Sequence, residues 1–310
     1  MRTNRFNFHQ IETKRIFIFL ILVFGVYYCL WLAAILLPEN VGNAVYSFLR
    51  FPIIFMGTPA LSVFLTRKIT GDKSVIAYNA KVWKNKKTAL FSMFVPTVFI
   101  LVGAVLFYLI FPNDLDYSGD YIIQSFSSFG APSEISFTVP SLLIMGLIVC
   151  IISAFCVPSW FIALGEEIGW RGYLLPLLCK KMSARCAVLL NGVLWGLAHA
   201  PLIYFGMNYG MNYAGAPYSG IAMMILFCMT MGIYMSFVTL RANNCMYAAI
   251  IHGAVNIIGE VPVYVSFSTQ STLLGPNPSG IIGMSMLLIG AVILLFKLPK
   301  HNMSVVSETQ

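Results

Sequence analysis

The segment GEEIGWRGYLLPLL, residues 165–178, places two carboxylates and a guanidinium inside one of the most apolar parts of the chain. Charge at the centre of a membrane costs about 2.5–3.5 kcal/mol per residue to insert, so an ionisable group there usually serves a function. On a helix, Glu167 and Arg171 stand four residues apart with the acid first, the better order for an ion pair. Glu166 is turned about 100° away from them. The spacing therefore predicts one paired and one unpaired carboxylate.

An unpaired carboxylate in apolar surroundings takes up a proton more readily than in water. A general base or acid that works near neutral pH needs this property. Gly165 and Gly169 lie four residues apart on the same predicted helix. Such a small-xxx-small pattern lets a second helix backbone approach closely. We therefore expect another helix to pack against this one beside Glu166.

The composition indicates an all-α, polytopic membrane protein. Of 310 residues, 59% are hydrophobic and 10% charged, against about 25% charged residues in soluble domains. The net charge of +8 comes from Lys and Arg placed between apolar segments, which is a topology signal and argues against nucleic-acid binding. The seven cysteines form no CxxC pattern, so neither a disulfide framework nor a thiolate metal site is indicated.

Apolar runs of 18 or more residues are candidate transmembrane helices. They predict about eight spans, at roughly 16–37, 44–66, 89–111, 141–178, 187–205, 219–240, 245–264 and 280–298. The fourth span is too long for one simple crossing and contains Pro158 and Pro176. A proline inside a helix removes a hydrogen bond and clashes with the preceding turn, so we expect this span to be kinked.

The charges between the spans segregate. With eight spans, nearly all cations fall before the first span, after the second, fourth and sixth, and after the last. The other connections hold acidic residues, with Arg50 as the one cation on that side and an external loop at 112–138. Under the positive-inside rule, the sequence predicts a cell-membrane protein with both termini in the cytoplasm.

Two histidines lie inside apolar spans, and both share a helix face with other polar groups. Asn191, Trp195 and His199 recur every four residues on the fifth span, and His252 and Asn256 are four apart on the seventh. At 1.5 Å per residue, Glu166, His199 and His252 lie roughly 21, 21 and 16 Å from the basic residues at the ends of their spans. We expect spans four, five and seven to bring these groups together.

This set of residues fits the hydrolysis of an amide without a covalent intermediate. A carboxylate and an imidazole can hold and deprotonate a water, while a second imidazole and an amide can stabilise the oxyanion that forms. A catalytic zinc held by Glu166, His199 and His252 is the alternative chemistry, weakened because no HExxH pattern occurs. Buried Glu, His and Arg also build proton relays in transporters, whose charges would be spread over both halves of the chain.

Three motifs occur in order on successive spans: Glu166-Glu167-x-x-x-Arg171, Trp195-x-x-x-His199 and His252-x-x-x-Asn256. Together they resemble the CPBP family of intramembrane proteases, which includes type II CAAX prenyl endopeptidases and bacterial bacteriocin-processing and lysostaphin-resistance proteins. The resemblance covers roughly residues 141–265. It departs at Trp195, where the family pattern often has Phe.

The resemblance implies that Glu166 is the catalytic base, that His199 helps hold the water, and that His252 and Asn256 form the oxyanion site. Glu167 and Arg171 belong to the first motif and are expected to support it as an ion pair. The family has been described both as zinc-dependent and as glutamate-dependent, and the unpaired Glu166 favours the second description, with no cofactor. A non-catalytic peptide-binding immunity protein is the further alternative.

The implied substrate is a membrane-anchored or amphipathic peptide, CAAX-type prenylated in the eukaryotic and archaeal relatives, cut near the cytoplasmic membrane surface. We divide the chain into a cytoplasmic N-terminal segment (1–15), helices 1–3 with the external loop (16–140), a CPBP-like catalytic core of helices 4–7 (141–265), and the last helix with a cytoplasmic tail (266–310).

Overall fold

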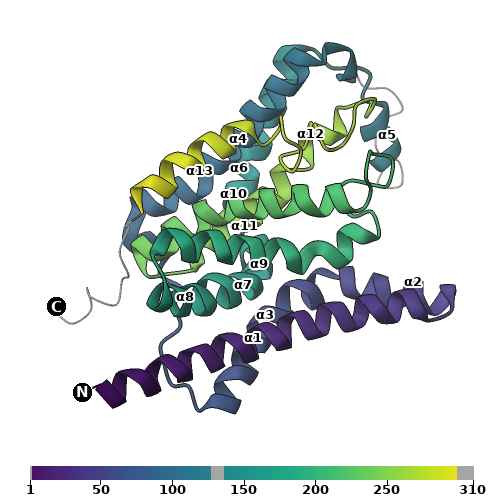
Figure 1. Cartoon of the computed structure of the whole chain (residues 1–310). Helices are drawn as coiled ribbons and strands as arrows, with labels where there is room; N and C mark the ends of the chain where they lie inside the picture. Colours follow the sequence, from purple (N-terminus) through teal and green to yellow (C-terminus); the bar gives the residue numbers. More distant parts are fainter. Residues whose placement is uncertain (1, 127–135, 299–310) are drawn as a thin grey trace.

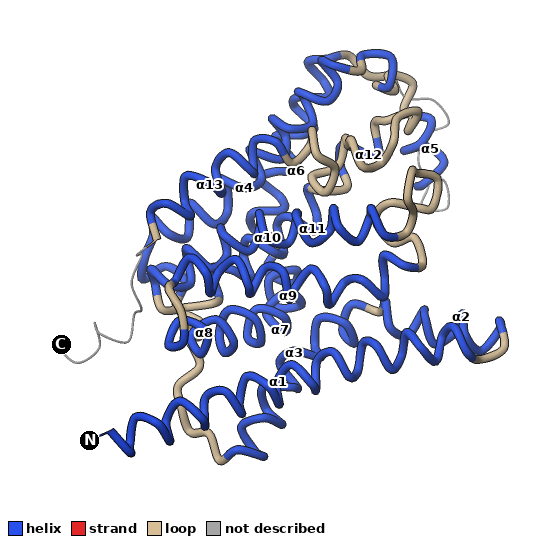
Figure 2. Tube along the Cα trace, viewed as in Figure 1, coloured by secondary structure: helices blue, strands red, loops and turns tan. Residues whose placement is uncertain are grey.

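The computed structural model describes residues 2–126 and 136–298, and the regular structure of this part of the chain consists of helices (Figures 1 and 2). The all-α prediction is therefore confirmed. The tail predicted after the last span and part of the predicted external loop lie outside the described residues.

Within the described residues, five helices are long and apolar enough to cross a membrane, or up to seven spans if each of two bent pairs counts as one. The five are built on α1 (Arg2–Leu36), α4 (Lys86–Ile110), α9 (Ala184–Tyr204), α10 (Tyr218–Ala242) and α11 (Met246–Ile258) with the short α12 (Val261–Tyr264). The eighth predicted span is α13 (Ser285–Lys297), of 13 residues. Its length of about 20 Å is less than the hydrocarbon thickness of about 30 Å, so α13 alone is too short for a full crossing.

The second predicted span is a bent pair, α2 (Glu39–Arg50) and α3 (Pro52–Thr70), whose axes differ by 63°. The break is at Phe51, which has an extended backbone (φ −63°, ψ 123°). The ring of a proline disfavours the helical conformation in the residue before it. Pro52 therefore ends α2 at this point and starts α3 in a new direction.

The fourth predicted span is bent by 60°, which confirms the expected kink. It consists of α6 (Val139–Phe155), α7 (Val157–Glu167), a π-helical segment η4 (Ile168–Leu174) and α8 (Leu175–Lys181). The break is at Cys156, and Pro158 lies in the first turn of α7, where a missing N–H costs nothing. Pro176 likewise lies in the first turn of α8, directly after the π-helix.

Close helix packing surrounds the segment with the two carboxylates. A Cβ atom on Gly165 would lie 2.5 Å from the carbonyl oxygen of Met56 on α3, and one on Gly253 of α11 would lie 2.8 Å from the backbone of Ser159 on α7. Only glycine permits these approaches, so the predicted close contact beside Glu166 is confirmed. Helix α7 thereby lies between α3 and α11, while α9 packs along α10.

The basic connections gather at one end of the helix bundle, which we call the cationic end: the start of α1, the 71–81 loop, the α8–α9 turn and the end of α13. Lys180 pairs with Glu12 at 3.0 Å, and Arg15 with Asp72 at 3.2 Å. Arg185 donates to the carbonyl of Phe296 on α13. These bonds join segments far apart in the sequence, and Figure 1 shows the same end on the left.

Asp72 is held in its charged form at this end. Burial alone would raise the pKa of its carboxyl, but hydrogen bonds from Ser74 and Tyr173 and the charge of Arg15 together lower this pKa below its usual value. The Ser74 amide and the Tyr173 hydroxyl lie 2.9 and 3.1 Å from the carboxylate oxygens.

The opposite end, which we call the acidic end, is formed by the loops after α1, α4, α9 and α12. Asp114 accepts hydrogen bonds from the side chains of Ser266 and Thr269. The hydroxyl of Tyr209, after α9, donates to the carbonyl of Ser279 at 3.0 Å. The segregation of charged connections expected from eight crossings is therefore present in the fold. The orientation of the bundle in a membrane stays a prediction.

Candidate functional site

The predicted ion pair of the first motif is formed. Nη1 of Arg171 lies 3.0 and 3.1 Å from the two carboxylate oxygens of Glu167, and both side chains are fully buried. Arg171 belongs to the π-helix η4 that follows the two carboxylates. Asn191 of α9 donates to the carbonyl of Trp170 in the same π-helix at 2.9 Å, which fixes this wider helical turn against α9. Such π-helical turns occur frequently at functional sites.

Glu167 also holds a histidine of another span. Oε1 of Glu167 lies 2.8 Å from Nδ1 of His252 on α11. A carboxylate oxygen accepts here, so Nδ1 of His252 carries the proton and Nε2 is the ring nitrogen left for a substrate. Nε2 accepts in the neutral ring and donates only when the ring carries a second proton. Glu167 therefore fixes both the orientation and the donor atoms of His252.

Glu166 has different surroundings from Glu167. Its Oε2 accepts a hydrogen bond of 2.5 Å from the indole Nε1 of Trp195 on α9. Its Oε1 is buried and has no hydrogen-bond partner among the residues that the structure describes. No cation pairs with Glu166 in the same part of the chain, as the spacing predicted. One oxygen of Glu166 is thus anchored and the other is free to accept from a bound molecule.

His199 is held by its own helix. Its Nδ1 lies 2.9 Å from the carbonyl oxygen of Trp195, one turn earlier on α9. Because a carbonyl oxygen can only accept, Nδ1 of His199 carries the proton. In the neutral ring Nε2 is then an acceptor, which is the form that can hold a water by one of its hydrogens.

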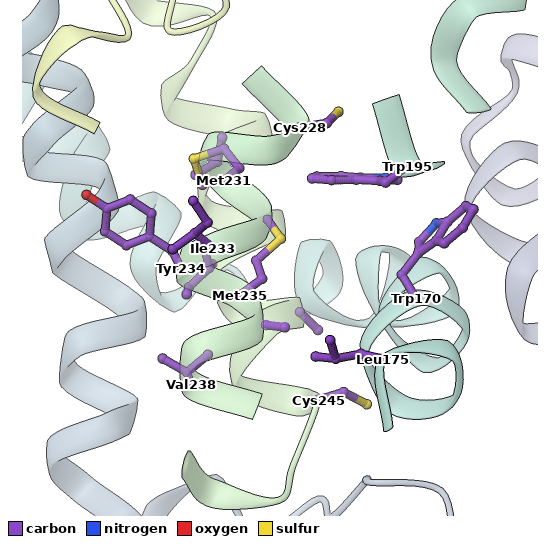
Figure 3. Close-up of a cluster of buried hydrophobic side chains, with 14 of the residues drawn as sticks. Trp170, Leu175, Trp195, Cys228, Met231, Ile233, Tyr234, Met235, Val238 and Cys245 are labelled. Atoms are coloured by element: carbon purple, nitrogen blue, oxygen red, sulfur yellow. The ribbon is translucent and has the colours of Figure 1, made fainter. Parts of the chain in front are cut away.

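Trp195 lies at the centre of these residues. Its ring makes edge contacts with the rings of His199 (centroids 5.6 Å apart) and His252 (5.3 Å). The guanidinium of Arg171 lies over the Trp195 ring, 4.2 Å from its centroid. Figure 3 shows the indole lying between α10, with Met231 and Met235, and the helix that carries Trp170. A single side chain therefore contacts the paired arginine, the unpaired carboxylate and both imidazoles.

A cavity of about 250 Å³ brings the predicted catalytic residues to one surface. Glu166, His199, His252 and Asn256 all line it, whereas Glu167 and Arg171 do not. Six of the apolar residues in the wall contain sulfur, namely Met56, Met207, Met224, Met231, Met235 and Cys228. The structure thus unites side chains from α7, α9 and α11, the fourth, fifth and seventh predicted spans. The cavity separates the four residues from the two that support them.

The role of Trp195 could not be read from the motif, in which it stands only as a departure from the family's phenylalanine. The structure shows that the indole N–H makes a hydrogen bond to Glu166 that phenylalanine has no group to make. The available signal was the Trp195–His199 spacing together with the rule that a buried indole N–H usually finds a partner.

The donor set of the zinc alternative does not fit a metal ion in this structure. Among the described residues, no group of three or more His, Cys, Asp or Glu side chains is placed to hold one. Zinc takes four ligands in a tetrahedral arrangement. The hydrogen bonds to Oε2 of Glu166 and from both Nδ1 atoms leave Oε1 and the two Nε2 atoms free, but these three atoms are not gathered around one point as a zinc ion requires.

Fold and site together define a polytopic α-helical membrane protein with a buried cavity lined by one carboxylate, two imidazoles and an amide. Residues 140–258, which include all three motifs, match the model of the family described as type II CAAX prenyl endopeptidase Rce1-like. The chain is also 26% identical over 245 residues to CAAX prenyl protease 2 of Methanococcus maripaludis, an alignment that spans 77% of this chain and 81% of that protein. The chain therefore carries an Rce1-like domain, which confirms the resemblance drawn from the motifs.

Proposed function

We propose that this protein is an intramembrane endopeptidase in which Glu166 and His199 activate a water and His252 and Asn256 bind the oxyanion. The observation that carries the proposal is the different state of the two adjacent carboxylates. Glu167 is occupied by Arg171 and His252, whereas Glu166 keeps one buried oxygen without a protein partner in the described chain. The Rce1-like match and the archaeal relative support the endopeptidase class.

In the first step, water bridges Oε1 of Glu166 and Nε2 of His199. As the water oxygen bonds to the carbonyl carbon of the peptide, one water proton passes to Glu166. The carbonyl π electrons move to its oxygen and form a tetrahedral oxyanion. The fixed Oε2–indole bond of Glu166 keeps the carboxylate in one orientation during this transfer.

The oxyanion is stabilised by hydrogen-bond donors that already face the position where it forms. Asn256 is exposed to the cavity and offers its amide N–H groups, and His252, with Nδ1–H bonded to Glu167, offers Nε2–H in its doubly protonated form. Donors of this kind contribute about 3–4 kcal/mol each to the barrier in other hydrolases. When the C–N bond breaks, the proton on Glu166 passes to the leaving amine. The products are a carboxylic acid and an amine.

The substrate that fits this site is a membrane-anchored or amphipathic peptide. The cavity lies within a bundle of membrane-spanning helices and has a methionine-rich wall. Methionine is flexible and polarisable, so such a wall adapts to apolar side chains of different shapes. The archaeal relative is named as a CAAX prenyl protease, and a CAAX-type prenylated peptide is accordingly the first substrate to test.

The proposal is tested by cleavage of a panel of membrane-anchored peptides, prenylated and not prenylated, with purified protein in detergent. We expect Glu166→Gln and His199→Ala to abolish cleavage while the thermal unfolding midpoint is retained. Glu39→Gln is the matched control, since this glutamate is exposed at the start of α2. Equal activity of wild type and Glu166→Gln would eliminate the mechanism.

The same assay separates the two chemistries. We propose that no metal takes part, because the only free oxygen of Glu166 is the one needed for the water. Cleavage should then be unchanged after treatment with a chelator. Loss of activity that added zinc restores would instead establish the metal-dependent alternative.

A further inference from the structure

We propose that the peptide enters the catalytic cavity from the acidic end of the bundle, and hence from the outer face of the membrane. This inference rests on the proposed function, and it differs from the cut near the cytoplasmic surface expected from the sequence. It defines the substrate class as peptides that are exported or exposed at the outer face. A prenylated peptide, the first substrate to test, would accordingly have to reach the site from that face.

The first observation is the pattern of exposure in the cavity wall. The deep residues Glu166, Trp195, Met231 and Met235 are 0–3% exposed. The exposed residues of the lining fall in three places: Arg50 and Pro52 at the α2–α3 bend, Met207 and Asn208 after α9, and Asn256 and Glu260 at the end of α11. The cavity therefore opens where these three segments end.

The second observation is that the loops beside this opening belong to the acidic end. Asn277, Pro278 and Ser279 also line the cavity, and Tyr209 bonds to the carbonyl of Ser279. Tyr209 follows directly after the exposed Asn208. None of the described cavity-lining residues lies in the 71–81 loop, the α8–α9 turn or α13, which form the cationic end.

The third observation is the depth of His199 along α9. His199 is five residues from the end of α9, about 8 Å at 1.5 Å per residue, and 15 residues from its start at the cationic end, about 22 Å. His252 lies six residues, about 9 Å, from each end of α11. The imidazole of His199 is therefore closer to the acidic end, and that of His252 lies midway.

The charge distribution then gives the side of the membrane. The stretch from 67 to 87, which joins the end of α3 to the start of α4, holds seven Lys and Arg residues, and the α8–α9 region adds three more. Cytoplasmic connections carry an excess of Lys and Arg within short distances of the spans. The acidic end, with Arg50 as its one cation in the predicted connections, is accordingly the outer face. Arg50 and Glu260 both belong to the cavity lining there, so a peptide meets one cation and one carboxylate before the apolar interior.

The first experiment measures the two faces directly, without any substrate. Single cysteines are placed at Asn208, on the cavity rim, and at Lys84, at the cationic end, in a chain whose exposed Cys29 and Cys186 are replaced by alanine. The parent chain without an added cysteine is the blank. In intact bacteria, a membrane-impermeant maleimide should label Asn208→Cys, and it should label Lys84→Cys only after permeabilisation. The reverse pattern would overturn the inference.

The second experiment measures where cleavage occurs. A membrane-impermeant peptide cleaved by the detergent-solubilised enzyme is offered to right-side-out and to inverted membrane vesicles. We expect cleavage by the first and loss of cleavage by the second, recovered when detergent opens the inverted vesicles. Cleavage by inverted vesicles alone, or equally by both, refutes outer-face access. Absence of cleavage in detergent would contradict the proposed function itself, and the cysteine labelling would still decide the accessible face.

Discussion

The indole N–H of Trp195 offers a sharp test of the active-site geometry. Trp195→Phe keeps an aromatic ring beside Arg171 and both imidazoles, and it removes the one hydrogen bond that holds Oε2 of Glu166. Phenylalanine is also the residue that the family pattern often has at this position. The substitution therefore separates the effect of the hydrogen bond from the effect of filling the space.

The size of the effect follows from the burial of Glu166. Hydrogen bonds to charged groups contribute about 1.5–3 kcal/mol. If this stabilisation orients the base in the transition state, its loss corresponds to about a 10- to 100-fold fall in kcat/KM, since each 1.36 kcal/mol is tenfold. After the substitution, neither oxygen of the buried carboxylate would have a partner in the described protein.

A separation of kcat from KM distinguishes this role from a structural one. If the hydrogen bond from the indole orients the base in the transition state, Trp195→Phe should lower kcat and kcat/KM by the same factor and leave KM near the wild-type value. The assay is peptide cleavage in detergent over a range of substrate concentrations.

Trp170→Phe is the matched control. Trp170 is fully buried on the adjacent π-helix, and its indole N–H has no hydrogen-bond partner among the described residues. Its replacement should lower stability without lowering kcat. The reasoning fails if Trp195→Phe has the wild-type kcat, or if both variants lower kcat equally.

Three further changes probe the scaffold around the site. Glu167→Gln leaves Arg171 buried without its counter-charge and should destabilise the protein by about 3–5 kcal/mol, seen as a lower thermal unfolding midpoint in detergent. Gly253→Ala forces α11 away from the Ser159 backbone; a cost of about 1–3 kcal/mol and reduced cleavage are expected, and unchanged values of both would contradict the close packing. Because the pKa of Asp72 is lowered in the fold, its contribution to stability is complete above about pH 4 and is lost as pH falls further. Acid unfolding below that pH should accordingly be less steep in Asp72→Asn, and an unaltered slope would argue against the lowered pKa.

Much of the fold is encoded locally and could be predicted. Long apolar runs identify α1, α4, α9 and α10, and Pro158 correctly placed the fourth span among the bent ones. The break at Phe51 was missed because the apolar run 44–66 continues through it. Hydropathy averages over a window of residues and is insensitive to one proline, although Pro52 carried the signal through its restriction of the preceding residue.

The sequence was enough to predict which residues form the site, but not the contacts between those residues. Helical periodicity places Glu167 with Arg171 because both lie on one helix. The bond between Glu167 and His252 joins residues 85 positions apart, and it depends on how closely α11 packs on α7. Gly253 permits that close approach because it has no side chain. For the same reason, its place in the sequence does not indicate which helix it contacts.

These contacts give the two adjacent carboxylates opposite tasks. Glu167 bonds Arg171 and His252 and does not line the cavity, so its carboxylate holds two other side chains in place. Glu166 faces the cavity, and Trp195 is its one hydrogen-bond partner among the described residues. Exchanging the two environments would leave a base that is already neutralised and an arginine without its counter-charge. The order of the two glutamates on the helix, set by a turn of about 100° between them, is therefore what makes one of them available for catalysis.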